Sequence, residues 1–333
     1  MSGVPATANR LLTVTDLVRQ FQVGKGFLRK PKTVHAVNGV SFHVDAGETF
    51  ALVGESGCGK STVGRTVMGF HPPTAGTVEF EGASIGAMSR RELRPIRRRI
   101  QYVFQDPYAS LPARLPVAQI LSEPLEIHGI GDPASRRARV LELLELVGLR
   151  KEVASRYPHE FSGGQRQRIG IARALALEPN LLILDEPVSA LDVSVQAQVV
   201  NLLDRLQSDL GLGYIFIAHD LGVVRHISDR IAVMYLGTIV ETGPAATIFD
   251  APQHPYTQAL LSAVPVQDPR LRDRSRRQLL SGDLPSPTAI PVGCPFITRC
   301  PKVQDICRTE RPQLQPTSSG ALSACHFTAQ KNG

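Results

Sequence analysis

The chain alternates short apolar runs with amphipathic stretches from residue 11 to about residue 250. Six of the apolar runs have the length of a buried strand, namely 50–53, 77–80, 100–104, 181–184, 214–218 and 231–236. Strand-length runs that alternate with helix-length stretches are typical of an α/β fold. The pattern therefore predicts an α/β core over residues 11–250, in which we find no internal repeat.

A helical region interrupts this pattern between about residues 107 and 178. Leu141, Leu144 and Val147, mixed with Glu and Arg, predict an amphipathic helix. Residues 117–128 predict another helix, although Pro124 within them weakens the prediction. We expect a helical subdomain over about 107–178, inserted into the α/β core.

Proline and glycine become frequent after residue 252, and the regular apolar periodicity is lost. This change predicts a separate, irregular C-terminal extension over residues 251–333. Four of the five cysteines lie in that extension, whereas Cys58 lies in the core: Cys294, Cys300, Cys307 and Cys325.

The overall composition is that of a globular protein, with 42% hydrophobic and 20% charged residues among 333 and a net charge of +7. Two arginine-rich stretches carry much of the excess charge. No aromatic residues are interleaved with these arginines to stack on bases, so solvated faces are favoured and no nucleic-acid partner is expected. The arginines are Arg90, Arg91, Arg94, Arg97, Arg98 and Arg99, and Arg270, Arg272, Arg274, Arg276 and Arg277.

No apolar run reaches the ~18 residues that a membrane span needs. The first ten residues lack the basic start and apolar run of a signal peptide. We therefore expect a cytosolic protein. If it works at a membrane, other subunits must supply the membrane-spanning segments.

A glycine-rich segment follows the apolar run 50–53 and fits the pattern G-x-x-x-x-G-K-[ST]. Its glycines let several backbone N–H groups point at one phosphate, and the following helix start adds its positive dipole end. Lys60 is expected to bridge the β- and γ-phosphates, and Ser61 to ligate Mg²⁺. Cys58 is expected only to fill space. The predicted nucleotide-binding residues are Gly54, Ser56, Gly57, Cys58, Gly59, Lys60, Ser61 and Thr62.

The apolar run 181–184 ends in two carboxylates, Asp185 and Glu186. At the tip of a buried parallel strand, Asp185 could hold Mg²⁺ through water. Glu186 could polarise a water molecule for in-line attack on the γ-phosphate. Together with the glycine-rich loop, this strand end predicts a nucleotide hydrolase.

A second phosphate-binding helix start is predicted at Phe161-Ser162-Gly163-Gly164-Gln165. Ser162 is a natural N-cap, and the two glycines expose backbone N–H groups. A chain that binds one nucleotide has no obvious use for a second such start, unless it completes a partner's site.

These motifs resemble those of the ABC transporter ATPases, whose signature motif is S-G-G-Q, and the resemblance covers residues 11–250. Gln105 matches the Q-loop, Asp192 the D-loop and His219 the switch histidine, in the family's order. The resemblance implies a P-loop NTPase fold of the ABC type, in which two such domains face each other head to tail. Each ATP would then lie between the Lys60 loop of one subunit and the signature of the other, here Ser162, Gly163, Gly164 and Gln165.

The resemblance also assigns roles to single residues. His219 would contact the γ-phosphate, Gln105 would sense Mg²⁺, and Asp192 would pack across the dimer. Phe21, near the end of the first strand, is the candidate to stack on adenine. The catalytic set is then Glu186, His219 and Gln105, and the Mg²⁺ ligands are Ser61, Gln105 and Asp185.

Further segments resemble the dipeptide and oligopeptide importers, namely 53–60, 186–195, 254–261, 282–287 and 293–296. The whole chain is similar to the second ATP-binding subunit of such an importer. That resemblance implies a related ATPase as heterodimer partner, two transmembrane permeases and an external peptide-binding protein. It also implies peripheral attachment at the cytoplasmic face of the inner membrane. The cargo stays open among peptides, nickel chelates, glutathione and opines.

The C-terminal cysteines have the spacing C-x5-C-x6-C-x17-C, which matches neither a zinc ribbon nor a ferredoxin. Four thiolates could hold one Zn²⁺ or one [4Fe–4S] cluster, or they could be free or paired thiols. Resemblance to the peptide importers favours the [4Fe–4S] cluster, with Zn²⁺ as the alternative.

Two other functions remain open at this point. A soluble ABC ATPase could act on ribosomes or DNA, but such proteins usually carry two ATPase cassettes or a long coiled-coil insertion, and this chain has neither. A regulatory subunit would have a degenerate site, but Lys60, Asp185, Glu186 and His219 are all intact.

Overall fold

The computed structural model describes residues 9–24, 31–263 and 285–328, without the side chains of Pro107 and Ala109. The described residues form two compact units. Unit 1 comprises 9–12, 43–49 and 80–217. Unit 2 comprises 13–24, 31–42, 50–79, 218–263 and 285–328.

The strands of unit 1 form a buried parallel layer in the order β6-β7-β8. Tyr102 pairs with Ile183, and Ile183 pairs with Ile215. Every residue of β7 and β8 is buried, which explains why these strands are continuous apolar runs in the sequence. The three strands confirm the predictions at 100–104, 181–184 and 214–218: β6 (Ile100–Val103), β7 (Leu181–Asp185) and β8 (Gly213–Ala218).

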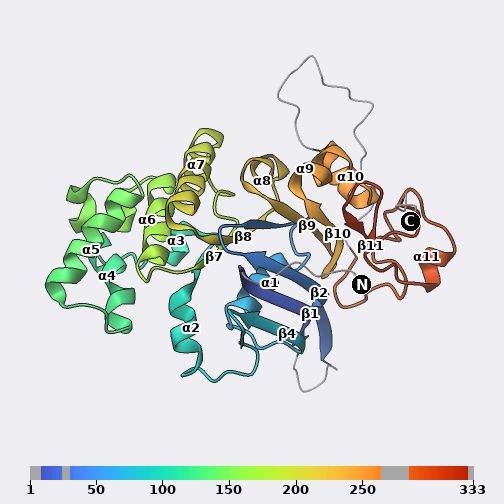
Figure 1. The fold of residues 1–333 in the computed structure, drawn as a ribbon, viewed down its shortest axis with the longest axis horizontal. Helices are drawn as coiled ribbons and strands as arrows, with labels where there is room; N and C mark the ends of the chain where they lie inside the picture. The colour runs from blue at the N-terminus through green and yellow to red at the C-terminus, as the bar shows by residue number, and fades with distance from the viewer. Residues whose placement is uncertain (1–8, 25–30, 264–284, 329–333) are drawn as a thin grey trace, which may run out of the picture. The chain divides into compact units, whose positions relative to one another are not determined.

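Between residues 107 and 178 the backbone that the structure describes forms only helices and loops. In Figure 1 the green helices α4, α5 and α6 gather together, in agreement with their mutual contacts. The helices predicted around residues 117–128 and 141–147 are confirmed, and Pro124 lies within the first of them. The elements are α3 (Pro107–Ser110), α4 (Val117–Ile127), α5 (Pro133–Leu146), the 3₁₀ helices Lys151–Ser155 and Pro158–Glu160, and α6 (Gly163–Leu175).

Unit 2 carries a second set of core strands in the order β11-β12-β10-β9-β3. β3 and β9 are parallel, with Leu52 opposite Ala232, and β10 returns antiparallel to β9. C-terminal residues extend this sheet, because Ser323 pairs with Glu241 at the far side of β10. The strands are β3 (Thr49–Val53), β9 (Arg230–Tyr235), β10 (Thr238–Pro244), β11 (Gln315–Pro316) and β12 (Leu322–Ser323).

A separate sheet of long strands runs in the order β2-β1-β4. Its first two strands were not singled out by the apolar pattern, because their residues mix buried, half-buried and exposed positions. The strands are β1 (Arg10–Val23), β2 (Lys32–Asp45) and β4 (Ala75–Phe80), and the short β5 spans Ala83–Ser84.

The remaining helices are α1 (Lys60–Val67), α2 (Leu93–Arg99), α7 (Val193–Leu210), α8 (Leu221–Ile227), α9 (Ala245–Asp250), α10 (Pro255–Ser262) and α11 (Ile306–Thr309). Across the described part of the chain, no helix combines the length and apolarity that crossing a membrane requires.

Candidate nucleotide site

The glycine-rich loop connects β3 to α1, as the sequence predicts, and α1 begins at Lys60. Gly54 and Gly59 adopt φ values of +152° and +110°, which L side chains rarely adopt. A Cβ atom at Gly54 would lie 2.2 Å from the Met234 carbonyl oxygen, and one at Gly59 would lie 2.1 Å from the Ala36 carbonyl oxygen. The loop can therefore keep its close fit against β2 and β9 only with glycine at these two positions.

Lys60 folds back over the loop that precedes it. Its ammonium group donates hydrogen bonds to the carbonyl oxygens of Gly54 (2.7 Å) and Glu55 (3.0 Å). The side chain is only 4% exposed, and none of the ion pairs among the described residues includes it. A buried cation held by neutral carbonyls beside a glycine-built cradle fits a phosphate as its counter-ion.

The other predicted residues of the loop divide between its tip and the helix start. Ser56 and Gly57 are exposed at the tip, while Ser61 and Thr62 lie in the first turn of α1. Burial raises the pKa of the Cys58 thiol, and the side chain is 1% exposed. A buried thiol that keeps its proton is a poor nucleophile, which agrees with the space-filling role expected for Cys58.

Asp185 is the last residue of β7 and Glu186 directly follows it, and each is held by a residue of unit 1. The Tyr102 hydroxyl donates a hydrogen bond to Asp185 Oδ2 over 2.6 Å, and Asp185 is 1% exposed. Gln105 Nε2 donates to Glu186 Oε2 over 2.9 Å. The structure thus brings two predicted site residues, Gln105 and Glu186, into direct contact.

Glu186, the residue after β7, adopts a positive φ of +47°, which non-glycine residues rarely adopt. Its N–H donates to the carbonyl oxygen of Ile217 (2.9 Å), and its own carbonyl oxygen accepts from the Ser189 hydroxyl (3.1 Å). A non-glycine residue in this region is strained by roughly 1–3 kcal/mol, and such strain often accompanies function. The two hydrogen bonds hold Glu186 in this conformation.

Tyr102 is the residue of this site that the sequence analysis missed. It lies on β6, opposite Ile183 of β7, so the register of two parallel strands places its hydroxyl at the carboxyl end of β7. A tyrosine within an apolar strand gives no sequence signal for such a contact.

The signature segment starts α6, and Ser162 is its N-cap as predicted. The Ser162 hydroxyl accepts from the Gln165 N–H (3.4 Å), and Gln165 Oε1 accepts from the Ser162 N–H (3.1 Å). This reciprocal capping box leaves the backbone N–H groups of Gly163 and Gly164 at the positive end of a 13-residue helix. The segment can therefore receive an anion.

The remaining motif residues stand at element ends. Asp192 is exposed immediately before α7, where its carbonyl oxygen accepts from the Gln196 N–H (2.8 Å). His219 is exposed just after β8, in unit 2. Asp220 then caps α8 by accepting a hydrogen bond from the Gly222 N–H (2.7 Å).

Phe21 lies within β1, near its end, rather than after it. The Arg19 guanidinium stands 4.4 Å from the centre of its ring, and the His71 ring meets it edge-on at 5.3 Å. Burial, and then the charges of Arg19 and Arg65, lower the pKa of His71. The half-buried Phe21 ring is thus held in place by two neighbours.

The four C-terminal cysteines gather in one region of unit 2. The Cys294 N–H donates to the Cys307 carbonyl oxygen over 2.9 Å. Burial, followed by smaller contributions that include the charges of Cys307, Cys300 and Cys325, raises the pKa of Cys294 to about 11. Burial also raises the pKa values of Cys300 and Cys325, with further contributions from neighbouring cysteines.

This gathering is not a preformed metal site. In residues 9–24, 31–263 and 285–328, no group of three or more His, Cys, Asp or Glu side chains is arranged to hold a metal ion. The cysteines come within electrostatic range of one another, but the [4Fe–4S] cluster and its Zn²⁺ alternative remain predictions.

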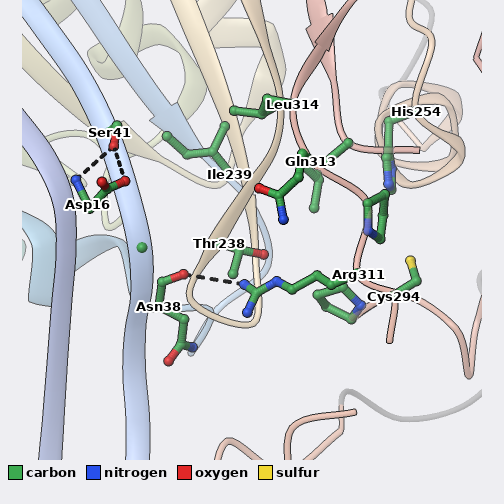
Figure 2. A pocket seen from close by; sticks show the side chains of 15 residues that line it. Asp16, Asn38, Ser41, Thr238, Ile239, His254, Cys294, Arg311, Gln313 and Leu314 are labelled. Atoms are coloured by element: carbon green, nitrogen blue, oxygen red, sulfur yellow. Dashed lines mark hydrogen bonds between the residues drawn. The ribbon is translucent and has the colours of Figure 1, made fainter. Parts of the chain in front are cut away.

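A cavity of about 380 Å³ in unit 2 lies beside this cysteine region (Figure 2). Arg311 donates a hydrogen bond to the Asn38 carbonyl oxygen there over 3.3 Å, and the Ser41 hydroxyl donates to Asp16 Oδ1 over 3.0 Å. Of the predicted site residues, Cys294 alone lines the cavity in the part of the chain that the structure describes. The cavity is therefore distinct from the phosphate-binding loop.

The first arginine-rich stretch lies on and before α2, where Leu93 is the buried residue of the helix and the arginines are half-buried or exposed. This arrangement agrees with the solvated face expected from the sequence. The second stretch, from Arg270 to Arg277, lies outside the described residues, as do residues 282–284.

Comparison with known families identifies two matching regions. Residues 37–189 match the family described as ABC transporter, and residues 240–307 match the C-terminal region of oligopeptide/dipeptide transporters. The second match includes Cys294, Cys300 and Cys307.

Similar proteins extend over nearly the whole chain. YkfD of Bacillus subtilis (strain 168) is 55% identical over 318 residues, which cover 95% of this chain and 95% of that protein. The oligopeptide transport ATP-binding protein AppF of the same organism is 51% identical and covers 97% of this chain and 98% of that protein.

Solved structures match the ATPase part. The ATP-binding cassette MJ0796, solved as a dimer bound to ADP and Pi, is 28% identical with a TM-score of 0.63, covering 71% of this chain and 99% of that one. CbiO1 from Clostridium perfringens, part of the ABC transporter complex cbiONQ, is 30% identical with a TM-score of 0.64 and covers 73% of this chain and 92% of that one.

Proposed function

The chain belongs to the ATP-binding subunits of oligopeptide and dipeptide ABC transporters, and on that basis we propose how its residues use ATP to drive peptide uptake. One observation carries the proposal. The same chain contains two helix starts suited to anions, the glycine-built loop before Lys60 and the Ser162-capped start of α6. The two starts serve different nucleotides, because the second completes the site of a partner subunit.

The residues of the loop bind the nucleotide. Lys60 gives up its bonds to the Gly54 and Glu55 carbonyls and contacts the β- and γ-phosphates. Ser61 and Asp185 would be ligands of Mg²⁺, and the Tyr102 hydroxyl keeps Asp185 in place. Phe21 stacks on the adenine ring. Gly54, Ser56, Gly57, Gly59 and Thr62 contribute to the phosphate cradle.

Glu186 is the general base for the attacking water. Gln105 donates to Glu186 Oε2 over 2.9 Å, so this bond occupies one of the sites at which the carboxylate can take a proton. Gln105 would also be a ligand of Mg²⁺, and loss of its hydrogen bond to Glu186 would leave Oε2 able to accept a proton from the attacking water. His219 contacts the γ-phosphate, and Asp192 packs across the dimer.

The partner in this dimer is a related but different ATPase, and the pair sits on two membrane-spanning permeases at the cytoplasmic face of the inner membrane. An external peptide-binding protein delivers the cargo. Membership in the oligopeptide/dipeptide family and the capped signature helix support this assembly. No nucleic acid takes part.

Reconstitution tests the function. The chain is purified alone, then with its partner ATPase, and finally with the permeases in liposomes, and the ATPase rate is measured at several protein concentrations. The isolated chain should hydrolyse slowly, and each addition should raise the rate, with a further rise when peptide-loaded binding protein is added. Full activity of the monomer, independent of concentration, would contradict the shared site. Stimulation by ribosomes or DNA in place of peptide would point to the soluble class instead.

We further propose that the four C-terminal cysteines ligate one metal centre, a [4Fe–4S] cluster. The cysteines lie within electrostatic range of one another, which supports the proposal, and a bound metal would order the irregular segment that carries them. Protein purified without oxygen should be brown and carry about four irons per chain. A colourless sample with one zinc per chain would identify a zinc site in place of the cluster. A sample with neither metal would contradict a metal centre at these cysteines.

A further inference from the structure

The cysteine segment, defined as residues 285–328, is fastened directly to the phosphate-binding loop. Arg299 places its guanidinium against Glu55, the second residue of that loop. Nη1 donates to Glu55 Oε2 over 2.7 Å, and Nη2 donates to Oε1 over 3.0 Å. The side chains are 8% and 29% exposed, so this two-pronged pair is largely shielded from water.

A second contact reaches the same loop residue. The Glu55 N–H donates to the hydroxyl of Tyr256 over 2.9 Å, and Tyr256 is fully buried in α10. Its ring packs against Phe296, with 5.4 Å between ring centres, and Phe296 is also fully buried. Phe296 lies three residues before Arg299 and accepts a hydrogen bond from its N–H (3.1 Å). One short turn of the cysteine segment therefore contacts Glu55 directly through Arg299 and indirectly through Phe296, which packs against Tyr256.

Lys60 completes the set, because it donates to the Glu55 carbonyl oxygen over 3.0 Å. Every polar group of Glu55 thus has a partner: the carboxylate has Arg299, the N–H has Tyr256 and the carbonyl has Lys60. A change in the turn that carries Arg299 therefore reaches the residue to which Lys60 is bonded before it turns to the phosphates.

The charges show what Arg299 contributes. An unpaired Glu55 carboxylate would stand beside the place where a triphosphate binds and would repel it. Arg299 neutralises that carboxylate and fixes its direction with two parallel hydrogen bonds. Arg299 also directly precedes Cys300 and follows Cys294 by five positions, so the fold around the cysteines decides where its guanidinium lies.

We propose that Arg299 is a positioning residue for the phosphate-binding loop, through which the folded state of the cysteine segment controls the affinity for MgATP. The inference rests on the proposed nucleotide site. By thermodynamic linkage, MgATP must in turn order the turn at 294–300.

Charge variants of the full chain test the proposal through MgATP affinity, measured by isothermal titration. Arg299→Met leaves Glu55 unpaired and should weaken binding by about tenfold or more. Glu55→Gln removes the repulsive carboxylate and should bind MgATP at least as tightly as the wild type. The double variant should return to within about threefold of the wild type. Arg308→Met, in the same segment but paired only locally with Asp305, is the matched control and should bind normally.

A merely structural contact gives a different result, because both single variants would then weaken binding and the double variant would bind no better than either of them. That outcome, or an Arg299→Met variant that binds within about threefold of the wild type, overturns the proposal. If Arg299→Met does not fold, Glu55→Gln and the double variant still test the proposal. Weaker MgATP binding in both of them would contradict a positioning role for Arg299. A wild-type chain that does not bind MgATP refutes the proposed function itself, a separate failure.

Amide hydrogen exchange tests the reverse direction. MgATP should slow exchange at residues 294–300 in the wild type and in Arg308→Met, but not in Arg299→Met. Equal exchange at 294–300 with and without MgATP, while the loop at 54–61 becomes protected, contradicts the coupling.

Discussion

Gln105 donates a hydrogen bond to Glu186 across 2.9 Å, so the Q-loop residue is bonded to the proposed general base. The two residues are 81 positions apart and meet because β6 and β7 are neighbouring parallel strands. A base whose oxygen accepts such a bond has one fewer site for a proton. A movement of the loop that carries Gln105 would therefore change how easily Glu186 accepts a proton.

Replacing Glu186 with glutamine should preserve MgATP binding but slow hydrolysis at least ~100-fold, the scale expected for loss of a positioned base. The reconstituted complex is assayed for phosphate release and for bound ATP. Glu145→Gln alters an exposed carboxylate on α5 and should leave the rate unchanged. Near-normal turnover in Glu186→Gln would assign the base elsewhere.

Removing the Tyr102 hydroxyl should raise the Mg²⁺ concentration needed for half-maximal hydrolysis several-fold, because Asp185 loses the donor that orients it. Tyr102→Phe should also cost about 1 kcal/mol of unfolding free energy. Tyr214→Phe removes another buried hydroxyl, which donates to the Leu203 carbonyl oxygen over 2.9 Å, and should cost a similar stability. An equal Mg²⁺ requirement in both variants would make the Tyr102 contact purely structural.

Two helix caps separate stability from catalysis. Ser162→Ala and Asp132→Ala each remove an N-cap side chain, on α6 and α5, and each should lower the unfolding free energy by about 1 kcal/mol. In the assembled complex only Ser162→Ala should also reduce ATPase activity, by about tenfold or more, because only that cap faces a partner's nucleotide. Equal ATPase rates in the two variants would argue against the shared site.

Stability should fall as the pH is lowered from about 6.5 towards 3, and His254 is one cause. Complete burial lowers the pKa of His254 to about 3, so the folded state keeps it neutral while the unfolded chain binds a proton near pH 6.5. The slope reaches about 1.4 kcal/mol per pH unit for this one group. Denaturant unfolding at several pH values measures it.

The matched variant is His254→Asn, which keeps an acceptor for the Tyr256 N–H, now bonded to His254 Nδ1 over 3.1 Å. Burial raises the pKa of Glu241, whose carboxylate accepts from the His254 N–H, and this stabilises the folded state as pH falls, with the opposite sign. Glu241 is present in both proteins, so the difference between their slopes reports His254. Equal slopes of unfolding free energy against pH in the wild type and in His254→Asn would exclude His254 as a cause.

The sequence by itself determined the local features. The run that becomes β7, the glycine-built loop before Lys60 and the Ser162 cap of α6 all follow from neighbouring residues, because strand burial, positive φ and capping are short-range properties. Their order along the chain was enough to indicate an ABC ATPase.

Only the tertiary structure decided which distant residues meet. Tyr102 and Asp185 are 83 positions apart, and Arg299 and Glu55 are 244 apart. A side-chain hydrogen bond of this kind leaves no periodic pattern in the sequence, since it depends on strand register and on where an irregular segment is fastened. For the same reason, the spacing of the four cysteines could not show that they gather within electrostatic range of one another yet stop short of a preformed metal site.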